Sequence, residues 1–506
     1  MLKGKTVVLG VTGSIAAYKA VDIASQLTQA GARVDVVMTE AAAEFITPLT
    51  FQAITGRSVT IDMFELPSHF NIEHISLAEA ADVIAIAPAT ANIIARLAAG
   101  MADDIVCCTV LASKSPVIIA PAMDTNMFEN PITQDNLSKL KARNFITVGP
   151  ASGRLASGKE GLGRLADIDD IIGAICQVLG RTGDLAGKDI VVTAGGTQEP
   201  IDPVRCITNR SSGKMGYALA EAARDRGARV TLITAPTSLA RPVGVEIVDV
   251  RTAQEMCQAV RDAVCQADAL IMAAAVADYQ PVTVARDKIK KKGAGLILEL
   301  EPTPDILGSV QGDFIKVGFA AESSDLIENA KQKLQQKGLD LIVANDITAV
   351  DSGFGADNNQ VTIIDRDGKI DRLPLLPKRE VADKILDKVV QLLAEKDKCP
   401  RIKIKVMPKA VQYGYIRIPK ERRHLFPGYK ESFTLVTDIG QITTYITGAP
   451  KGTPVGDPNR GDRIHHGLSF WYHKHPELQI GDSLVLVIKI IEPKKKYHLE
   501  IWEEVI

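Results

Sequence analysis

A strand–turn–helix–strand pattern at the start of the chain restricts the possible fold more than any other feature of the sequence. The apolar run Thr6–Val11 leads into the turn Thr12-Gly13-Ser14, a helical pattern from Ile15 to Ala30, and a second apolar run, Val34–Met38. This order is a βαβ unit, which builds a parallel sheet. The N-terminal part is therefore predicted to be an α/β domain.

Two further buried-strand candidates, Val83–Ala87 and Pro116–Ala120, are each followed by a proline. Parallel α/β sheets bind their ligands beyond the carboxyl ends of the strands. The turns at three of these ends have the sequences TGSIA, PATAN and PAMDTN. We expect a site where these small or polar turns meet.

The pattern starts again near Lys188 and predicts a second α/β domain. Its first elements are a strand, a long loop, a helix and a strand: Ile190–Thr193, Ala194–Ser212, Gly213–Arg226 and Val230–Ile233. Three later runs are read as further strands: Ala269–Ala275, Ile315–Phe319 and Leu341–Ala344. The helix Lys378–Glu395 closes the domain, and the charged segment EKDKCPR is predicted to be a linker.

The last hundred residues differ in composition and period. Residues 400–506 carry 17 Lys and Arg against 11 Asp and Glu, a balance of +6, although the whole chain has a net charge of −2. Four β-rich runs predict a small, mostly antiparallel barrel or sandwich without a convincing helix. These runs are Phe433–Val436, Gln441–Thr447, Ser483–Ile491 and Tyr497–Trp502. We therefore expect domains at residues 1–186, 187–398 and 399–506.

Composition excludes several classes of protein. A chain of 506 residues with 46% hydrophobic residues is long enough for three or four globular domains. Its seven cysteines form no CxxC pair, so neither a disulfide framework nor a zinc site is implied. No apolar run approaches the roughly 18–20 residues that span a bilayer, and the N-terminus shows no signal-peptide pattern. We expect a cytoplasmic protein without a membrane partner.

The turn at Gly13 is a candidate phosphate site, because exposed amides at a helix N-terminus attract anions. The turn is not GxGxxG, and the second strand ends in Met38-Thr39 rather than in an acidic ribose anchor. A mononucleotide is therefore favoured over a dinucleotide. Such a turn is also common without a ligand. A lone histidine such as His74, before an alanine-rich helix, is likewise more often structural than catalytic.

The sequence around the Gly13 turn and around His74 changes the interpretation of both. The segments HISLAEAADVIAIAPATANIIARLAAGMADD, APAMDTNMF and GRLASGKEGLGR resemble the flavin-dependent cysteine decarboxylases, and residues 1–180 are similar to phosphopantothenoylcysteine decarboxylase. The segments TAGGTQEPIDPVRCITNRSSGKMGYALA, AAAVADYQP, KIKKK, PDIL, GFAAE and KQKLQQKGLDLIVAND resemble phosphopantothenate–cysteine ligase. The two sets occur in the order of the fused bifunctional family of coenzyme A biosynthesis, over about 395 residues.

The resemblance implies a flavodoxin-like, FMN-binding three-layer sandwich followed by a second Rossmann-like α/β ligase domain. It places FMN against Gly13, Ser14, Ile15, Thr39, Pro88, Ala89, Thr90, Ala91 and Asn92. It assigns His74 as the active-site histidine and Met123 to substrate binding. Loss of CO₂ from an N-acyl cysteine leaves a carbanion without an electron sink. Oxidation of the thiol to a thioaldehyde supplies that sink, and flavin is the oxidant.

Two residues depart from the family pattern. Asp124 occupies the usual asparagine of PxMNxxM, and Ser157 lies where the family has a proton-donating cysteine. A hydroxyl is a far weaker acid than a thiol, whose pKa is about 8.5. Either this branch simply uses serine, or the final reduction of the ene-thiol is handled differently, with Asp124, water or another group supplying the proton.

For the ligase half, the resemblance implies CTP with Mg²⁺, an acyl-cytidylate of 4′-phosphopantothenate and its aminolysis by cysteine. Asn209 matches the family's catalytic asparagine and Lys288 the lysine that forms the intermediate. The implied CTP contacts are Met272, Ala273, Ala274, Asp278, Lys288, Pro304, Asp305, Ile306, Leu307, Phe319, Lys333 and Lys337. The segment Ser211-Ser212-Gly213-Lys214 also suits anion binding on its own, at a predicted helix start. The run Lys288, Lys290, Lys291 and Lys292 is read either as a phosphate clamp or as a solvated charge run.

The sequence also leads to an expected oligomeric state and to two alternative functions. The resemblance implies trimers of the decarboxylase and dimers of the ligase, which combine into a homo-dodecamer. One alternative is a ligase-only flavoprotein with an inactive decarboxylase half. Another places a nucleic-acid-binding role in the C-terminal domain, where bases and aromatics interleave: Tyr415, Arg417, Lys420, Arg422, Arg423, His424, Phe426 and Tyr429. Its histidines His465, His466, His473 and His475 also suggest metal binding, more weakly.

Overall fold

The computed structural model describes residues 2–63, 73–291, 296–322, 326–346 and 355–398. Of the C-terminal part it describes 401–405, 408–418, 423, 425–447, 462–464, 466, 468–475, 478, 484–492 and 494–503. The chain forms two compact units, one built mainly from residues 1–188 and the other mainly from 189–506. In the described part, no helix combines the length and the apolar character that crossing a membrane requires.

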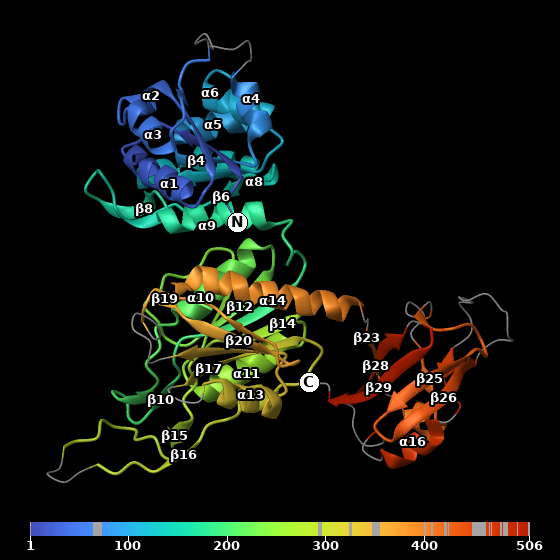
Figure 1. Ribbon diagram of the computed structural model, residues 1–506. Helices are drawn as coiled ribbons and strands as arrows, with labels where there is room; N and C mark the ends of the chain where they lie inside the picture. Colours follow the sequence, from blue (N-terminus) through green and yellow to red (C-terminus); the bar gives the residue numbers. More distant parts are fainter. Residues whose placement is uncertain are drawn as a thin grey trace. The chain divides into compact units, whose positions relative to one another are not determined.

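The first unit contains a six-stranded, fully parallel sheet in the order β3-β2-β1-β4-β5-β6 (Figure 1). Its strands are β1 Thr6–Val11, β2 Arg33–Met38, β3 Val59–Thr60, β4 Val83–Ala89, β5 Val117–Pro121 and β6 Ile146–Thr147. Without the two-residue β3, the order is that of flavodoxin-like sheets. The predicted parallel α/β fold is confirmed, with strand bounds within two residues of those expected.

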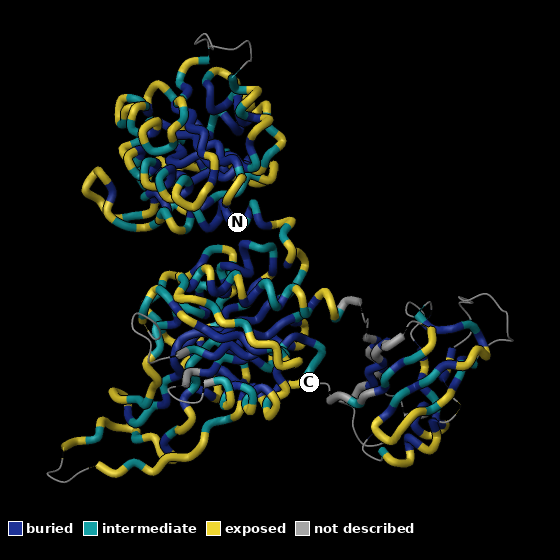
Figure 2. Tube along the Cα trace, viewed as in Figure 1, coloured by how far each residue is buried: buried dark blue, intermediate teal, exposed yellow. Residues whose placement is uncertain are grey.

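Helices cover both faces of this sheet. Buried side chains of α1, α3 and α9 pack on one face, and those of α5, α6 and α8 on the other. The helices are α1 Ala17–Gln29, α2 Glu40–Ala43, α3 Pro48–Thr55, α4 Glu73–Ala80, α5 Ala91–Ala99, α6 Ile105–Ala112, α7 Thr125–Glu129, α8 Pro131–Ala142 and α9 Ile168–Gly180. Figure 2 shows the strands as the buried centre of the unit. Because the strands are buried on both faces, most of their residues are apolar, although β2 contains buried Asp35.

The second α/β sheet has the order β13-β12-β9-β14-β17-β18-β20-β21. Its strands are β9 Asp189–Ala194, β12 Arg229–Thr234, β13 Glu246–Asp249, β14 Ala269–Met272, β17 Ile315–Glu322, β18 Leu341–Asp346, β20 Val361–Asp365 and β21 Ile370–Arg372. The first six follow the Rossmann strand order, which agrees with the prediction. Strands β20 and β21 add an antiparallel edge that the sequence did not indicate.

In the described residues of this domain the helices are α10 Lys214–Asp225, α11 Ala253–Val264, α12 Ile306–Ser309, α13 Leu326–Gln336 and α14 Lys378–Lys398. The segment expected to be a long loop contains a hairpin of β10 Gln198–Pro200 and β11 Cys206–Thr208. The expected linker is also partly wrong, because α14 continues through Lys398. A short pair, β19 Asn358–Asn359 and β22 Leu376–Pro377, precedes α14.

A two-stranded arm, β15 Tyr279–Pro281 and β16 Leu300–Pro302, extends from this domain. Figure 2 shows most of the arm exposed. Its apolar side chains include Tyr279, Ile297 and Leu300, and Ile297 is 94% exposed.

The C-terminal domain has a seven-stranded sheet in the order β23-β28-β29-β25-β26-β27-β24. The strands are β23 Arg401–Lys405, β24 Ile416–Arg417, β25 Ser432–Thr437, β26 Gly440–Thr447, β27 Arg463–Ile464, β28 Leu484–Glu492 and β29 Lys496–Glu503. All pairs are antiparallel except β25 with β29. The described part of the domain also has two short helices, α15 Pro408–Gln412 and α16 Leu468–Lys474, and Trp471 of α16 lies in its core. The mostly antiparallel prediction is confirmed.

Three of the interleaved basic and aromatic residues of this domain lie in its core and not on a surface. Phe426 and Tyr429 are core residues, and Arg423 is only 2% exposed. The Arg423 guanidinium forms an ion pair with Asp462 at 2.6 Å, and the Tyr429 hydroxyl donates to the same carboxylate at 2.8 Å. Lys420, Arg422 and His424 lie outside the described residues. For Arg423, Phe426 and Tyr429 the nucleic-acid reading of the sequence is wrong, because an internal carboxylate pairs with the arginine.

Candidate active sites

In the first unit, the turns after β1 and β4 are joined through Thr12. The Thr12 hydroxyl donates to the Pro88 carbonyl oxygen at 2.7 Å and accepts the Thr90 amide proton at 3.2 Å. Strands β1 and β4 are neighbours from which the chain proceeds in opposite directions, so the crevice between them is where such sheets bind ligands. The structure therefore brings the Gly13 turn and the PATAN turn together, as predicted.

Helix N-termini surround the same edge of the sheet. Thr39 caps α2 and Thr90 caps α5, each accepting a backbone N–H on its hydroxyl. At α1 the cap position is Ala16, which provides no side-chain acceptor. A Cβ on Gly13 would lie 2.6 Å from Cβ of Ala41, so only glycine fits this close approach. The 13-residue helix α1 follows a glycine turn and has no side-chain cap. Its N-terminal backbone N–H groups are therefore suited to bind the phosphate of a mononucleotide such as FMN.

His74 is the second residue of α4 and is half-buried. No hydrogen bond or ion pair within the described part of the chain involves its ring. Its neighbour Glu73 accepts a hydrogen bond from Thr60 at 3.0 Å, which fixes the start of the helix. Among the described residues, the ring is therefore positioned by the backbone of α4 alone.

The two departures from the family pattern, Asp124 and Ser157, contact each other. Ser157 lies at the tip of the hairpin formed by β7 Ala151–Arg154 and β8 Glu160–Arg164. Its hydroxyl donates to Oδ2 of Asp124 at 3.1 Å, while Oδ1 of Asp124 accepts the Asn126 amide proton at 3.1 Å as the cap of α7. The two substitutions therefore form one hydrogen-bonded pair.

The same hairpin is held against the substrate-binding turn. The Met123 amide donates to the Gly163 carbonyl oxygen at 2.9 Å. A Cβ on Gly163, whose φ is +149°, would lie 2.2 Å from the Met123 carbonyl oxygen. Glycine is required there, and it keeps Ser157 beside Asp124.

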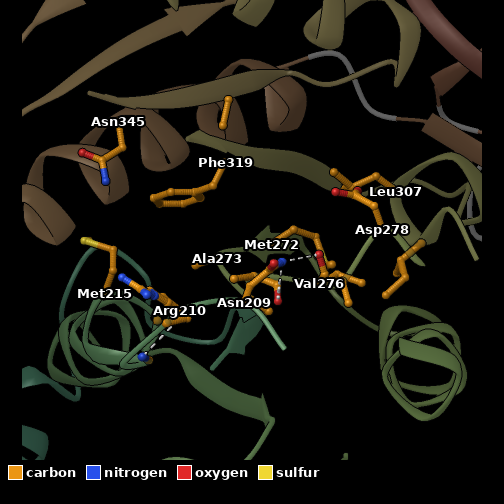
Figure 3. Close-up of a pocket in the computed structure, with 18 of the residues that line it drawn as sticks. Asn209, Arg210, Met215, Met272, Ala273, Val276, Asp278, Leu307, Phe319 and Asn345 are labelled. Atoms are coloured by element: carbon orange, nitrogen blue, oxygen red, sulfur yellow. Dashed lines mark hydrogen bonds between the residues drawn. The ribbon is translucent and has the colours of Figure 1, made fainter. Parts of the chain in front are cut away.

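In the second α/β domain, a cavity of about 590 Å³ opens at the carboxyl ends of β14, β17 and β18 (Figure 3). Asn209 and every predicted CTP position except Lys288 line this cavity: Met272, Ala273, Ala274, Asp278, Pro304, Asp305, Ile306, Leu307, Phe319, Lys333 and Lys337. The positions implied by resemblance thus converge on one site of suitable size for a nucleotide.

Asn209 is anchored by backbone carbonyls. Its side-chain amide donates to the Val276 carbonyl oxygen at 2.9 Å and to that of Ala275 at 3.5 Å, the two bonds drawn in Figure 3. This orientation leaves the side-chain oxygen of Asn209 as an acceptor at the cavity. A second acceptor is the side-chain oxygen of Asn345, which is buried in the cavity wall and has no hydrogen-bond partner among the described residues. A buried acceptor of this kind calls for a donor on a ligand.

Positive charge dominates the cavity. Five basic side chains line it, against the carboxylates of Asp278 and Asp305: Arg210, Lys214, Lys333, Lys337 and Lys378. Lys337 pairs with Asp305; partial burial of Asp305 raises its pKa, but the Lys337 ammonium and the Gly308 amide outweigh this and keep the pKa below its usual value. Burial, and then repulsion from Lys214, lower the pKa of Lys378, although Asp357 opposes this. The excess of cations suits a polyanion such as a triphosphate.

Lys288 does not line the cavity. It lies exposed on the arm between β15 and β16, and Lys290 and Lys291 follow it. Lys292 is outside the described residues. Asn345 and Lys378 were not singled out from the sequence, because they come from the end of β18 and the start of α14. Only the expectation that strand ends gather at one edge could have indicated Asn345.

One group of side chains in the described residues has the arrangement of metal ligands, namely Asp103, Asp104 and Cys107. Both carboxylates pair with Arg96, and Asp104 caps α6. These contacts explain the cluster without a metal. In the C-terminal domain, Nδ1 of His473 donates to the Ser469 carbonyl oxygen and His475 contacts Asp438. His465 lies outside the described residues.

Comparison with known proteins decides the family. A family model described as Flavoprotein matches residues 1–180, and the DNA/pantothenate metabolism flavoprotein C-terminal domain matches residues 185–393. The coenzyme A biosynthesis bifunctional protein CoaBC of Bacillus subtilis is 46% identical over 398 residues, which cover 78% of this chain and 98% of the relative. The chain belongs to the CoaBC family.

Two solved structures are similar to parts of this CoaBC family member. One is the C-terminal domain of a coenzyme A biosynthesis bifunctional protein CoaBC, 42% identical, covering 42% of this chain and 100% of that chain with a TM-score of 0.37. The other is the FMN-dependent cysteine decarboxylase SpaF, 31% identical, covering 35% of this chain and 97% of that chain with a TM-score of 0.31.

Membership of the CoaBC family establishes the general activity of this protein. The protein is a bifunctional enzyme of coenzyme A biosynthesis, with a flavoprotein decarboxylase domain and a ligase domain. An account in which only the ligase works, or in which the whole role lies in the C-terminal domain, is not favoured. Both family models end by residue 393, before the C-terminal domain begins.

Proposed function

We propose that the 590 Å³ cavity binds CTP and that the Gly13 and PATAN turns bind FMN. The observation that carries the first assignment is the convergence of the predicted CTP positions on one cation-rich cavity. The chain would then join 4′-phosphopantothenate to cysteine and decarboxylate the product to 4′-phosphopantetheine. Mg²⁺ would accompany the triphosphate, and we assign it no ligands.

In the ligase step, the carboxylate of 4′-phosphopantothenate attacks the α-phosphorus of CTP, and pyrophosphate leaves. The cysteine amine then attacks the acyl carbon, loses a proton, and CMP leaves. The basic side chains of the cavity offset the charge of the triphosphate and of the departing pyrophosphate. Asn209, held by Val276 and Ala275, presents its side-chain oxygen to the reacting groups. An N–H of the cysteine amine is a suitable donor to that oxygen.

Pyrophosphate release tests this assignment. We expect release by the purified full chain only when CTP, Mg²⁺ and 4′-phosphopantothenate are all present, followed by CMP release when cysteine is added. ATP in place of CTP serves as the matched control. Release no faster than in an enzyme-free blank would rule out the assignment.

In the decarboxylase step, FMN when bound supplies the oxidation of the substrate thiol and the later return of electrons. The protein's contribution is to bind the nucleotide phosphate at α1, to place His74 near the reacting carboxylate, and to hold a proton at the Asp124–Ser157 pair. The Ser157 hydroxyl already donates to Asp124, so its proton is directed toward a carboxylate. Proton delivery to the ene-thiol carbon is therefore expected to be the slow step.

Replacing Ser157 by cysteine is expected to raise the yield of saturated thiol with little change in CO₂ release. A thiol delivers a proton to carbon more readily than an alcohol at neutral pH, and each unit of pKa mismatch corresponds to about 1.4 kcal/mol. The ratio of ene-thiol to saturated product, measured by mass spectrometry, reports the effect.

Two matched variants identify the donor. If Ser157→Ala forms the saturated thiol at the parent rate while Asp124→Asn accumulates ene-thiol, the donor is Asp124 and not Ser157. The reverse pattern assigns the role to Ser157. Equal behaviour of both variants and the parent would mean that the pair has no part in proton delivery.

We also propose a homo-dodecamer, built from trimeric decarboxylase and dimeric ligase contacts. Exposed apolar side chains on each domain support it: Ile15, Tyr18, Phe45 and Leu49 on the first, and Tyr279, Ile297 and Leu300 on the arm of the second. Light scattering is expected to give twelve times the chain mass. A monomeric mass at micromolar concentration would overturn the proposal.

The proposed compartment is the cytoplasm. No disulfide joins any of the six cysteines that the structure describes. Reduced thiols are typical of proteins in reducing compartments.

A further inference from the structure

The C-terminal domain places two arginines directly opposite each other at one end of its sheet. In the antiparallel pair of β24 and β27, Ile416 faces Ile464 and Arg417 faces Arg463. Both isoleucines are buried and both arginines are exposed. Like charges directly opposite on neighbouring strands destabilise a sheet. The arrangement therefore costs stability unless an anion lies between or above the two side chains.

The described part of the chain supplies no such anion. No carboxylate in it forms an ion pair with Arg417 or Arg463. Asp462, beside Arg463 in the sequence, is turned inward, where it is held by Arg423 at 2.6 Å and by Tyr429 at 2.8 Å. The acidic residue next to Arg463 in the sequence is thus paired inside the core, while Arg417 and Arg463 are both exposed.

The arginines are held in place by their neighbours. The Arg463 guanidinium lies 4.5 Å from the centre of the Tyr415 ring. Thr447 is the cross-strand partner of Arg463 on β26, and its hydroxyl donates to the Arg463 carbonyl at 3.1 Å. Tyr445, two residues earlier on the same side of β26, stacks on exposed His466 at 5.5 Å. We call Tyr415, Arg417, Tyr445, Arg463 and His466 the arginine face.

We propose that the arginine face binds the phosphate backbone of double-stranded DNA. Guanidinium groups match phosphate oxygens in a planar, two-point geometry, and two of them side by side suit a ligand with closely spaced phosphates. The balance of +6 over residues 400–506 adds long-range attraction. A single carboxylate of an acidic peptide would be matched by one arginine, whereas duplex DNA carries one charge per about 1.7 Å of its axis.

The aromatic residues favour a duplex over a single strand. Single-strand sites present open rings on which unpaired bases stack. Here Arg463 covers one side of the Tyr415 ring, and His466 stacks on Tyr445. Each tyrosine ring of the face thus already contacts another side chain, Arg463 on Tyr415 and His466 on Tyr445. The phosphates are the chemistry that this face recognises, and they are sequence-independent.

The test uses the full chain and a fluorescein-labelled duplex of random sequence, about 20 base pairs long, in anisotropy titrations over a range of KCl concentrations. The parent is expected to bind with a negative slope of log affinity against log salt. The double variant Arg417→Ala/Arg463→Ala is expected to lose at least about tenfold in affinity and to reduce the slope by about two.

The matched control removes the same charge elsewhere on the domain. Lys474 and Lys495 are exposed and lie outside the arginine face, so Lys474→Ala/Lys495→Ala is expected to keep most of the affinity. Equal losses in the two double variants would mean general charge attraction and would overturn the proposal. So would parent-like binding by Arg417→Ala/Arg463→Ala, no binding by the parent, or tighter binding of single-stranded DNA or RNA of the same length. Unchanged pyrophosphate release and an unchanged melting temperature show that the variants are folded.

Discussion

Replacing His74 by asparagine is expected to abolish CO₂ release from 4′-phosphopantothenoylcysteine, by about 1,000-fold or more, while ligation continues at the parent rate. His74 lies in the first turn of α4, half-buried, and its ring makes no hydrogen bond or ion pair within the described residues. Its removal therefore breaks no structural contact that the structure records. Asparagine retains a polar side chain of smaller size but cannot take or give a proton near neutral pH.

Three measurements on one preparation separate chemistry from misfolding: the flavin absorbance spectrum, CO₂ release and pyrophosphate release. The first and third are expected to match the parent. Glu79→Gln, an exposed change on the same helix, serves as the control and is expected to leave all three unchanged. Equal loss of both activities in His74→Asn would point to misfolding, and retained CO₂ release would remove His74 from the mechanism.

Replacing Asn209 by alanine is expected to slow ligation by about 100-fold or more and to leave decarboxylation of supplied 4′-phosphopantothenoylcysteine unchanged. Loss of one preorganised polar group aimed at a reacting centre has an effect of this size. Alanine removes the acceptor oxygen at the cavity and also the two hydrogen bonds to Val276 and Ala275. The rates of pyrophosphate and CMP release, measured separately, show which half-reaction is slowed.

A second variant tests the orientation of the amide. In Asn209→Asp a carboxylate oxygen would face the Val276 carbonyl oxygen in place of the N–H donor. Repulsion is expected to turn the side chain away, so this nearly isosteric change should be as damaging as alanine. Gln258→Ala, on the exposed side of α11, is the control. An active Asn209→Asp enzyme would contradict the anchoring seen here.

The sequence predicted both α/β sheets because buried parallel strands are continuous apolar runs. Thr6–Val11 was predicted and is observed with the same bounds as β1. The hairpin of β10 and β11 was missed, since its strands are three residues long and contain Pro200 and charged Glu199. Such a strand pair is set by its packing against the rest of the domain, not by its own composition.

The burial of polar residues was the second feature that could not be predicted from the sequence. Arg423 was read as a surface cation, but it lies in the core because Asp462, far along the chain, pairs with it. Only the fold reveals this contact. For the same reason Asn345 and Lys378 were absent from the predicted CTP site, whose residues, Met272–Ala274 among them, were implied by the family resemblance and not by local pattern. Local sequence patterns indicate where strands and turns lie, whereas the other residues that line a cavity come from elements distant in the sequence.

The most direct test of the whole account is a single reaction of the full chain with 4′-phosphopantothenate, cysteine, CTP and Mg²⁺, followed by mass spectrometry. The account predicts 4′-phosphopantetheine as the product, with pyrophosphate, CMP and CO₂ released in equal amounts. In His74→Asn it predicts that CO₂ release is lost while pyrophosphate and CMP are still released. Accumulation of 4′-phosphopantothenoylcysteine without CO₂ by the parent protein, with flavin present, would contradict it.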